Sequence, residues 1–207
     1  MKIQLALDRL TTEECFRIVD AAGTSIDWIE IGTGVIKEYG MSIVRDMKAK
    51  YPDILILADM KTCDAGKHEA AQAFEAGADI MTVMAFSGDG TVRETLDTAK
   101  KYNKRVMFDL LGVKSKKRVD ELVALGADLV CLHVGKDMQK QGQFASKELF
   151  SLIEGINGIE VAMAGGINAE SAAELKDSPV DVLIVGSAIT GADDPKAAAD
   201  KIQQAIL

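Results

Sequence analysis

The sequence predicts a (β/α)8 barrel that forms a single domain over residues 1–207. Short apolar, β-branched runs recur at intervals of roughly 25 residues, each followed by a helical pattern, and this is the period of one βα unit. Runs that are apolar throughout, such as residues 183–185, are typical of parallel strands covered on both faces. A doubly wound sheet has five or six strands, so two of the eight predicted βα units would have no place in it. The closed barrel is therefore favoured.

The predicted strands are bounded by turn residues and glycines. They cover residues 3–7, 28–31, 54–58, 80–84, 105–110, 129–132, 160–163 and 182–185. Gly-Ala-Asp stands before two of them, at residues 77–79 and 126–128. Asp27 and Asp181 occupy the same place in two other units. Because a glycine there ends the preceding helix in the left-handed conformation, the units look homologous to one another.

Amphipathic helices are predicted where apolar residues recur at helical spacing. They cover residues 70–76, 91–102, 115–125 and 195–206, the last with Pro195 in its first turn. We expect Met47, Phe74 and Leu122 in the core. Residues 142–148 carry the weakest pattern and are a candidate mobile loop.

The charge balance excludes two classes of partner. The chain has 24 Lys and Arg against 32 Asp and Glu, a net charge of −8, so neither nucleic acid nor an anionic membrane is expected as a partner. The residues after Met1 show no signal-peptide pattern, and a cytoplasmic location is expected. Cys15, Cys63 and Cys131 match neither a disulfide framework nor a metal-ligand spacing, which predicts reduced thiols.

The most informative stretch is residues 59–64, which follows the third strand. Side chains two apart in a strand point the same way, so Asp59 and Lys61 should share one face, with Asp64 beyond them. Buried charges are costly unless they are paired or functional. The alternative interpretation is an Asp59–Lys61 ion pair, with Asp64 capping the helix that starts at Ala65.

Active sites of such barrels lie at the carboxyl ends of the strands, and here almost every strand end carries a reactive or turn-forming residue. These residues are Asp8, Glu30, Asp59, Lys61, Asp64, Asp109, His133, Lys136, Asp137, Gly165, Gly166, Gly186 and Ser187. The amino ends carry mainly helix-stop glycines and Asp. This asymmetry indicates a catalytic site at the carboxyl ends.

Two binding sites are predicted at those ends, one for a phosphate and one for a metal ion. The turns at Gly165-Gly166 and at Gly186-Ser187 are typical of a phosphate site after strands seven and eight, although a single Gly-Gly turn is weak evidence. Glu30 and Asp59 offer hard oxygen ligands for Mg²⁺; the alternative is a pair of rim acids.

His133 is the candidate acid or base, since the ordinary pKa of histidine lies near neutrality; the alternative is a histidine hydrogen-bonded to backbone. His68 lies early in an outer helix, and we expect it at the surface or in an interface.

The sequence Asp59-x-Lys61-x-x-Asp64 resembles the signature of the orotidine monophosphate decarboxylase suprafamily, and the resemblance covers the whole chain. The 3-hexulose-6-phosphate synthase branch is most similar, on residues 5–8, 29–33, 58–66, 133–135, 164–167 and 185–189. That branch joins formaldehyde to ribulose 5-phosphate. Within the suprafamily, a carboxylate at Glu30 implies a metal.

The resemblance also leaves an alternative, 3-keto-L-gulonate-6-phosphate decarboxylase, which shares the enediolate intermediate. Decarboxylases usually show arginines after the histidine of strand six and in the turn after strand eight. This chain has Val134, Gly135 and Lys136 at the first place and Ser187 at the second, which favours the synthase. Lys136 leaves one cation near the site, so decarboxylation stays open.

The resemblance implies a role for each group. Glu30 and Asp59 hold Mg²⁺, His133 removes the C1 proton and Lys61 donates to the enediolate oxygen. Asp8, Asp64 and Asp109 orient the lysine and the hydroxyl groups. A barrel that only senses a sugar phosphate is the non-enzyme alternative, but binding alone does not need an acid, a base and a metal pair.

The resemblance further implies a homodimer with shared active sites, in which Asp64 reaches into the neighbouring subunit's site. Between two signature residues lies Cys63, which we expect to be a buried structural residue. The alternative is a thiolate favoured by Lys61 and sensitive to oxidation.

Overall fold

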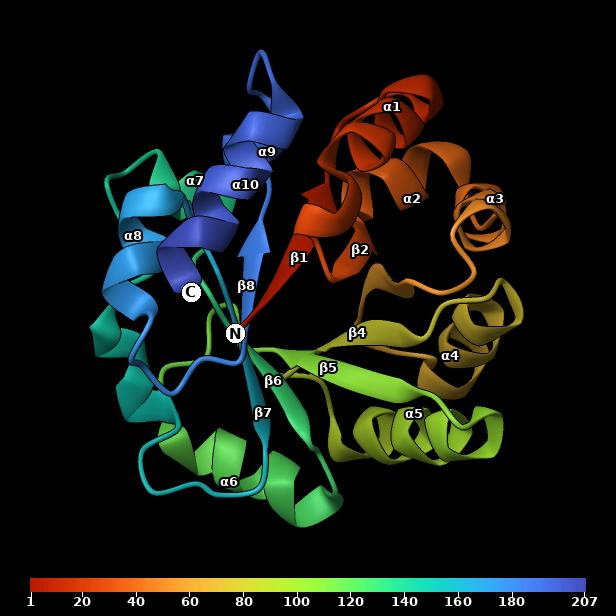
Figure 1. Ribbon diagram of the computed structural model, residues 1–207. Coiled ribbons are helices and arrows are strands. Elements are labelled where there is room, and N and C mark those ends of the chain that lie inside the picture. Colours follow the sequence, from red (N-terminus) through yellow and green to blue (C-terminus); the bar gives the residue numbers. More distant parts are fainter.

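The computed structural model describes residues 1–207, apart from the side chain of Lys147. Parallel strands close into a barrel in chain order, and β8 returns to pair with β1 (Figure 1). The predicted (β/α)8 barrel is therefore confirmed. The strands are β1 (Lys2–Leu7), β2 (Trp28–Ile31), β3 (Leu55–Thr62), β4 (Ile80–Met84), β5 (Arg105–Asp109), β6 (Leu129–His133), β7 (Glu160–Ala164) and β8 (Val182–Val185).

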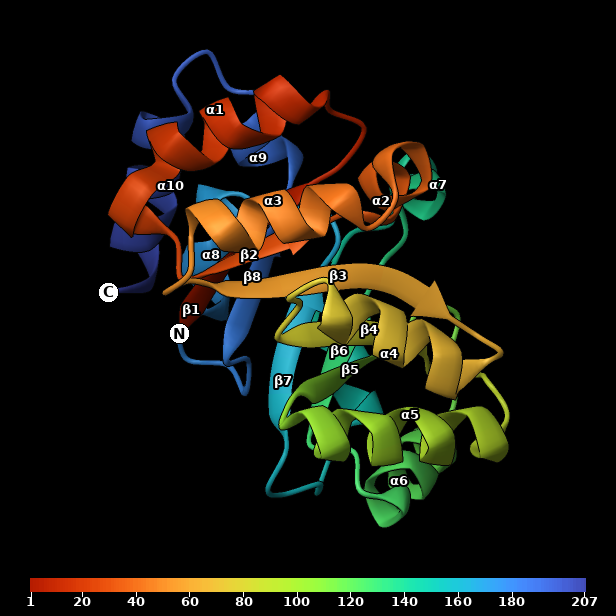
Figure 2. The ribbon, with the colours of Figure 1, turned by 90° about the vertical axis from the view of Figure 1, so that its right-hand side faces the viewer.

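Strand β3 departs most from its prediction. It was expected to end at Ala58 but continues to Thr62, so Asp59 and Lys61 lie within the strand (Figure 2). The pairing with β4 shifts register between Ala58 and Thr62, as in a β-bulge. Charged side chains did not end the strand because they point into a polar pocket, described below. The other strand ends differ from the predicted ones by at most one residue.

Helices surround the strands on the outside of the barrel (Figures 1 and 2). They are α1 (Thr12–Ala22), α2 (Thr33–Tyr39), α3 (Ser42–Lys50), α4 (Gly66–Glu75), α5 (Asp89–Tyr102), α6 (Lys116–Leu125), α7 (Lys136–Gln139), α8 (Ala169–Leu175), α9 (Ser187–Thr190) and α10 (Pro195–Ile206), with 3-10 helices η1 (Gly23–Ser25) and η2 (Lys147–Leu152). The range predicted for α10 is confirmed. Helix α4 starts four residues before the predicted Ala70, because its first turn is polar and carries no apolar signal.

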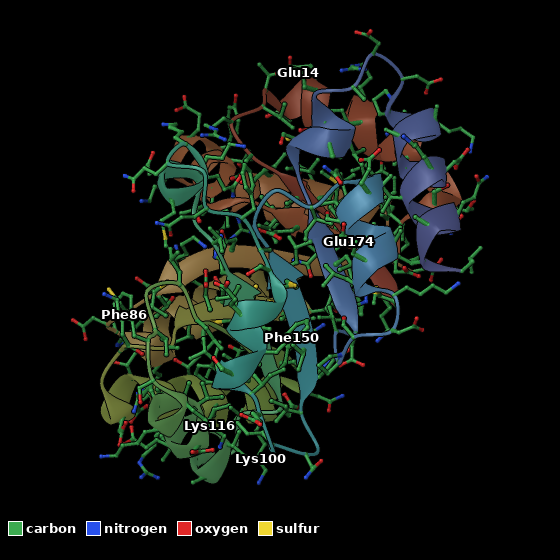
Figure 3. All side chains as sticks on the ribbon, turned by 90° about the vertical axis from the view of Figure 1, so that its left-hand side faces the viewer. Glu14, Phe86, Lys100, Lys116, Phe150 and Glu174 are labelled. Carbon is green, nitrogen blue, oxygen red and sulfur yellow. The ribbon has the colours of Figure 1, made fainter. Side chains whose placement is uncertain are left out.

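The sixth unit lacks a long helix: the helical segment expected after every strand is present there only as short helices. The short α7 is followed by irregular residues 140–146 and then by η2. Figure 3 shows Phe150 on η2, which lies against this side of the barrel. Residues 142–146 form a loop as predicted, but 147–148 belong to η2.

Two apolar clusters build the core, because strand side chains alternate between the two faces of the barrel wall. The larger cluster lies between strands and helices and includes Leu5 and Ile29. The predicted core residues Met47, Phe74 and Leu122 belong to it, with exposed fractions of 0%, 4% and 0%. The smaller cluster fills the barrel and consists of Ala6, Trp28, Leu57, Ile80, Met107, Leu129, Cys131, Ala162, Ala164, Val182 and Ile184.

The aspartates that precede strands close the amino end of the barrel. A carboxylate oxygen of each accepts the backbone N–H at the start of the preceding strand: Asp27 from Ile3 (2.7 Å), Asp79 from Ile56 (2.9 Å) and Asp181 from Val161 (2.8 Å). The glycines predicted to stop helices, Gly77 and Gly126, have φ of 100° and 107°. The glycines and aspartates that recur before the strands therefore have a structural role, at the face of the barrel opposite the pocket.

Candidate active site

A cavity of about 370 Å³ opens at the carboxyl ends of the strands. Most of the predicted site residues line it, and they come from seven of the βα units. They are Asp8, Glu30, Asp59, Lys61, Asp109, His133, Lys136, Gly165, Gly166, Gly186 and Ser187. The prediction that the strand ends converge on one site is confirmed for this set.

Lys61 joins the carboxylates of β3 and β5 at this cavity. Its Nζ lies 2.8 Å from Asp109 Oδ2 and 3.2 Å from Asp59 Oδ1. Asp59 and Lys61 therefore do face the same way, and the ion pair of the alternative interpretation exists as well. Burial alone would lower the pKa of Lys61, but the charges of Asp59 and Asp109 raise it above the ordinary value. Lys61 is consequently a permanent cation and a hydrogen-bond donor.

An unusual backbone conformation places this lysine. Lys61 has φ of 47°, in the left-handed region that residues other than glycine rarely adopt. Its backbone N–H donates to Thr82 Oγ1 at 2.8 Å, and that hydroxyl donates to Asp59 Oδ1 at 2.7 Å. Thr33 Oγ1 donates to the other oxygen of Asp59 at 2.6 Å. Hydrogen bonds from Thr82 on β4 and Thr33 at the start of α2 thus fix the bulge and the carboxylate together, and strained backbone of this kind is common at functional sites.

His133 is paired with a carboxylate. Its Nδ1 lies 3.0 Å and 2.9 Å from the two oxygens of Asp109, so the alternative of a histidine held by backbone is wrong. Burial alone would raise the pKa of Asp109, but His133 and Lys61 hold it well below the usual range. Because the ionised carboxylate accepts the proton of Nδ1, the neutral imidazole carries its lone pair on Nε2.

Glu30 is a buried acid of the site, like Asp59 and Asp109, with 7% of its surface exposed. Burial and then the charge of Asp59 raise the pKa of Glu30 to about 8. Gln4 Nε2 donates to Glu30 Oε2 at 2.5 Å. Among the described residues, no three His, Cys, Asp or Glu side chains form a ready set of metal ligands.

The two glycine turns lie side by side, because β7 pairs with β8 through Ala164 and Ile184. Gly165 and Gly166 both have positive φ, of 131° and 79°. A Cβ at Gly165 would lie 2.8 Å from the Cβ of Val134, and one at Gly166 would lie 2.8 Å from Phe144. Only glycine fits this turn, so the backbone forms the cavity wall there.

Asp64 and Asp137 do not line the cavity of this chain. Asp64 is exposed, and no side chain caps α4, whose N-cap Ala65 has a left-handed backbone; the helix-cap interpretation of Asp64 is therefore wrong. Asp137 is exposed on α7 and pairs with Lys140 at 2.9 Å. His68 is exposed on α4, as expected.

Cys63 is also exposed, which contradicts its expected burial. It directly follows Thr62, the last residue of β3. Cys15, Cys63 and Cys131 are free thiols, as predicted.

The cavity is also lined by polar side chains that were not among the predicted site residues. They are Gln4, Arg9, Thr33, Thr82, Gln139 and Thr190. A signal for Gln4 was present, because Gln4, Ala6 and Asp8 alternate along β1 and so point into the barrel together. The threonines carry no such signal, since threonine is common in strands and helix starts anyway.

The family model described as "Orotidine 5'-phosphate decarboxylase / HUMPS family" matches residues 1–202. The chain belongs to this family. Its relatives in the family include the 3-hexulose-6-phosphate synthases of Bacillus subtilis (37% identical, 100% of this chain and 99% of the relative) and Methylomonas aminofaciens (39% identical, 96% of each chain).

Solved structures of the family superpose along the whole chain. A crystal structure of a 3-hexulose-6-phosphate synthase has a TM-score of 0.95, 38% identity and complete coverage of both chains. A 3-keto-L-gulonate-6-phosphate decarboxylase from Vibrio cholerae has a TM-score of 0.88 and 26% identity, and the alignment covers 99% of this chain and 96% of that chain. Similarity is thus greater to the synthase than to the decarboxylase. Among the described residues, no helix is long and apolar enough to cross a membrane.

Proposed function

We propose that this chain is an aldolase-type lyase with 3-hexulose-6-phosphate synthase activity, which joins formaldehyde to D-ribulose 5-phosphate. The observation that carries the proposal is the continuous set of contacts from Asp59 through Lys61 and Asp109 to His133 at the cavity. It combines a fixed cation, an oriented base and buried carboxylates, which are the parts needed to form and stabilise an enediolate. The identity to synthases over the whole chain supports the same reaction.

The phosphate of the sugar is proposed to bind at the turns of Gly165-Gly166 and Gly186-Ser187. These turns lie side by side at the cavity, where bare backbone can approach an anion closely. Lys136 is exposed at the same cavity and adds a positive charge. In this proposal the phosphate lies at the ends of β7 and β8, and the cation lies at β2 and β3.

Mg²⁺ is the proposed cofactor, and the carboxylates fit it. Glu30 and Asp59 crowd negative charge into a buried space, as the raised pKa of Glu30 reflects, and a cation there would relieve it. Two carboxylates suffice, because Mg²⁺ usually keeps several waters or binds substrate oxygens. When bound, Mg²⁺ supplies electrostatic stabilisation of negative charge on the substrate oxygens.

The chain's own residues then account for the proton transfers. Nε2 of His133 takes the proton from C1 of ribulose 5-phosphate, while Asp109 holds the ring through Nδ1 and stabilises the imidazolium that forms. Lys61 Nζ donates a hydrogen bond to the enediolate oxygen. C1 then attacks the carbon of formaldehyde, a C–C bond forms, and the aldehyde oxygen takes up the proton from Nε2 of His133, which restores the neutral base. Asp8, at the mouth of the cavity, orients a substrate hydroxyl.

A homodimer with shared sites completes the proposal. Asp64 is exposed beside the cavity rather than in it, although it follows β3 by only two residues. Phe86 exposes 61% of its surface at the carboxyl end of β4, and Figure 3 shows it at the outer edge of the molecule. Because β3 pairs with β4, Asp64 and the exposed apolar Phe86 follow neighbouring strands, and this supports an interface across which Asp64 acts.

The test incubates the protein with ribulose 5-phosphate, formaldehyde and Mg²⁺ and measures hexulose phosphate by chromatography. Product formation that depends on both substrates is expected. No hexulose phosphate, together with CO₂ released from 3-keto-L-gulonate 6-phosphate, would replace the synthase by the decarboxylase. Tight binding of ribulose 5-phosphate without exchange of its C1 proton in deuterated water would favour the sensing barrel instead.

A further inference from the structure

Gln4 is a buried polar side chain that the proposed mechanism leaves without a role. It lies on β1 with 0% of its surface exposed, and its side chain contributes to the wall of the active-site cavity. It lies next to the apolar cluster that fills the barrel, which includes Ala6 on the same strand and Trp28 on β2. Glutamine is rarely buried completely unless its amide is used.

The nitrogen of the Gln4 amide is hydrogen-bonded to Glu30. Gln4 Nε2 donates to Glu30 Oε2 at 2.5 Å, and both side chains lie inside the barrel wall. The bond occupies one carboxylate oxygen and sets the orientation of the carboxylate. The other carboxylate oxygen is left for a ligand in the cavity.

The oxygen of the Gln4 amide, Oε1, is buried and accepts no hydrogen bond from the described residues. A buried acceptor without a donor is uncommon and marks a place where a water or ligand hydrogen belongs. Since Glu30, Asp59 and Gln4 Oε1 are all oxygen acceptors in one cavity, the ligand that satisfies them together is a hydrated cation or a hydroxyl group.

We propose that Gln4 is a positioning residue of the cation site, which it serves through both ends of its amide. The nitrogen holds Glu30 in the orientation that binds the ion, and the oxygen accepts a hydrogen bond from a water of the hydrated ion. This inference rests on the proposed function in assigning the cation to Glu30 and Asp59. Partners of this kind orient ligands, and their loss typically weakens metal binding by about 10- to 100-fold.

The test measures Mn²⁺ binding by electron paramagnetic resonance, with Mg²⁺ as competitor, in the wild type and in Gln4→Leu, Gln4→Met and Glu30→Gln. Leucine and methionine keep most of the volume of glutamine but remove both hydrogen-bonding groups. Methionine is included because it adapts to its surroundings should the leucine variant not fold. Thr95→Val is the matched control, since Thr95 is also a polar residue with 0% exposure but lies on α5 outside the cavity.

The expected result is Mn²⁺ binding about 10- to 100-fold weaker in the folded Gln4 variant, with inorganic phosphate binding within twofold of wild type. Thr95→Val should bind both ions as the wild type does. Wild-type Mn²⁺ affinity in a folded Gln4 variant, with weak binding in Glu30→Gln, would overturn the role of Gln4 alone.

Equal loss of Mn²⁺ and phosphate binding in both Gln4 variants would show a structural role and overturn the inference too. Equal Mn²⁺ binding by wild type and Glu30→Gln would overturn the proposed cation site, and the role of Gln4 with it.

Discussion

His133 Nδ1 lies 2.9 Å from Oδ2 of Asp109, and the same oxygen accepts a hydrogen bond from Lys61 at 2.8 Å. One buried carboxylate therefore orients the proposed base and fixes the proposed cation. Asp109 is itself held by the backbone N–H of Leu111, which lies 2.9 Å from Oδ1. Asp109 on β5 thus couples the two side chains that are proposed to be catalytic.

The first prediction concerns this coupling. Asp109→Asn keeps the shape of the side chain but removes its charge, so the histidine tautomer and the position of the lysine are no longer controlled. We expect kcat for hexulose phosphate synthesis to fall by about 100- to 10,000-fold, with a smaller change in KM. Steady-state kinetics and far-ultraviolet circular dichroism measure the rate and the fold. A variant that folds and keeps more than half of kcat would contradict the proposed role of Asp109.

The second prediction separates phosphate binding from chemistry. A Cβ at Gly186 would meet nothing closer than 3.7 Å, from the carbonyl oxygen of Ala6, so the protein itself has room for a side chain. Gly186→Val should fold but raise KM for ribulose 5-phosphate about tenfold or more, because the side chain fills space proposed for the phosphate. Asp59→Asn should instead lower kcat.

Ser187→Ala is the mild control for this position, since one hydroxyl contributes at most about 1 kcal/mol of hydrogen bonding. An unchanged KM in a folded Gly186→Val protein would mean that the phosphate binds elsewhere.

The third prediction concerns stability at the opposite face. Asp79 accepts the N–H of Ile56 at 2.9 Å and pairs with Lys48 at 2.8 Å and Lys104 at 2.6 Å, with 13% of its side chain exposed. Asp79→Ala should lower the free energy of unfolding by about 2–3 kcal/mol at pH 7, because it leaves these donors unpaired. Kinetic constants per folded molecule should not change. Urea unfolding followed by circular dichroism gives the stability.

The stabilisation by Asp79 should also depend on pH. Burial alone would raise the pKa of Asp79, but the hydrogen bonds from Lys104 and Lys48 lower it below its ordinary value. Its contribution is therefore complete above the unfolded pKa of about 4 and is lost as the pH falls through the lower folded value. The difference between wild type and variant should be constant from pH 5 to 8 and shrink below pH 4.

Asp128→Ala is the matched control, because Asp128 occupies the same place before β6 but its side chain is 60% exposed and pairs with Arg105 at 3.3 Å. It should cost less than about 1 kcal/mol. Equal losses in the two variants would contradict the assignment of Asp79 as a strand anchor.

The fourth prediction tests the shared site. Lys61→Ala and Asp64→Ala proteins should each be inactive, but a mixture that exchanges subunits should recover part of the activity. Recovery is expected because one site of each heterodimer would receive both an intact Lys61 and an intact Asp64. Activity after denaturation and refolding together, compared with separately refolded proteins, measures it. Demonstrated exchange without recovery would place Asp64 outside the neighbouring site.

Much of this architecture follows from local pattern. The recurrence of apolar runs predicted the barrel because each βα unit must bury a strand between neighbours and a helix, and this leaves a period in the chain. The site then followed from topology, since parallel strands bring all their carboxyl ends to one face. Asp59 and Lys61 could be placed together for a similar reason, because strand side chains alternate.

The partners of the site residues depended on the closed barrel. Gln4 meets Glu30, and Lys61 meets Asp109, only because strand register and barrel closure bring together residues that are 26 and 48 positions apart. The left-handed backbone of Lys61 is held by Thr82 on the next strand, which no local pattern of a lysine predicts. A strand or helix signal is a property of neighbouring residues in the chain, whereas a hydrogen bond across a barrel is a property of the packed molecule.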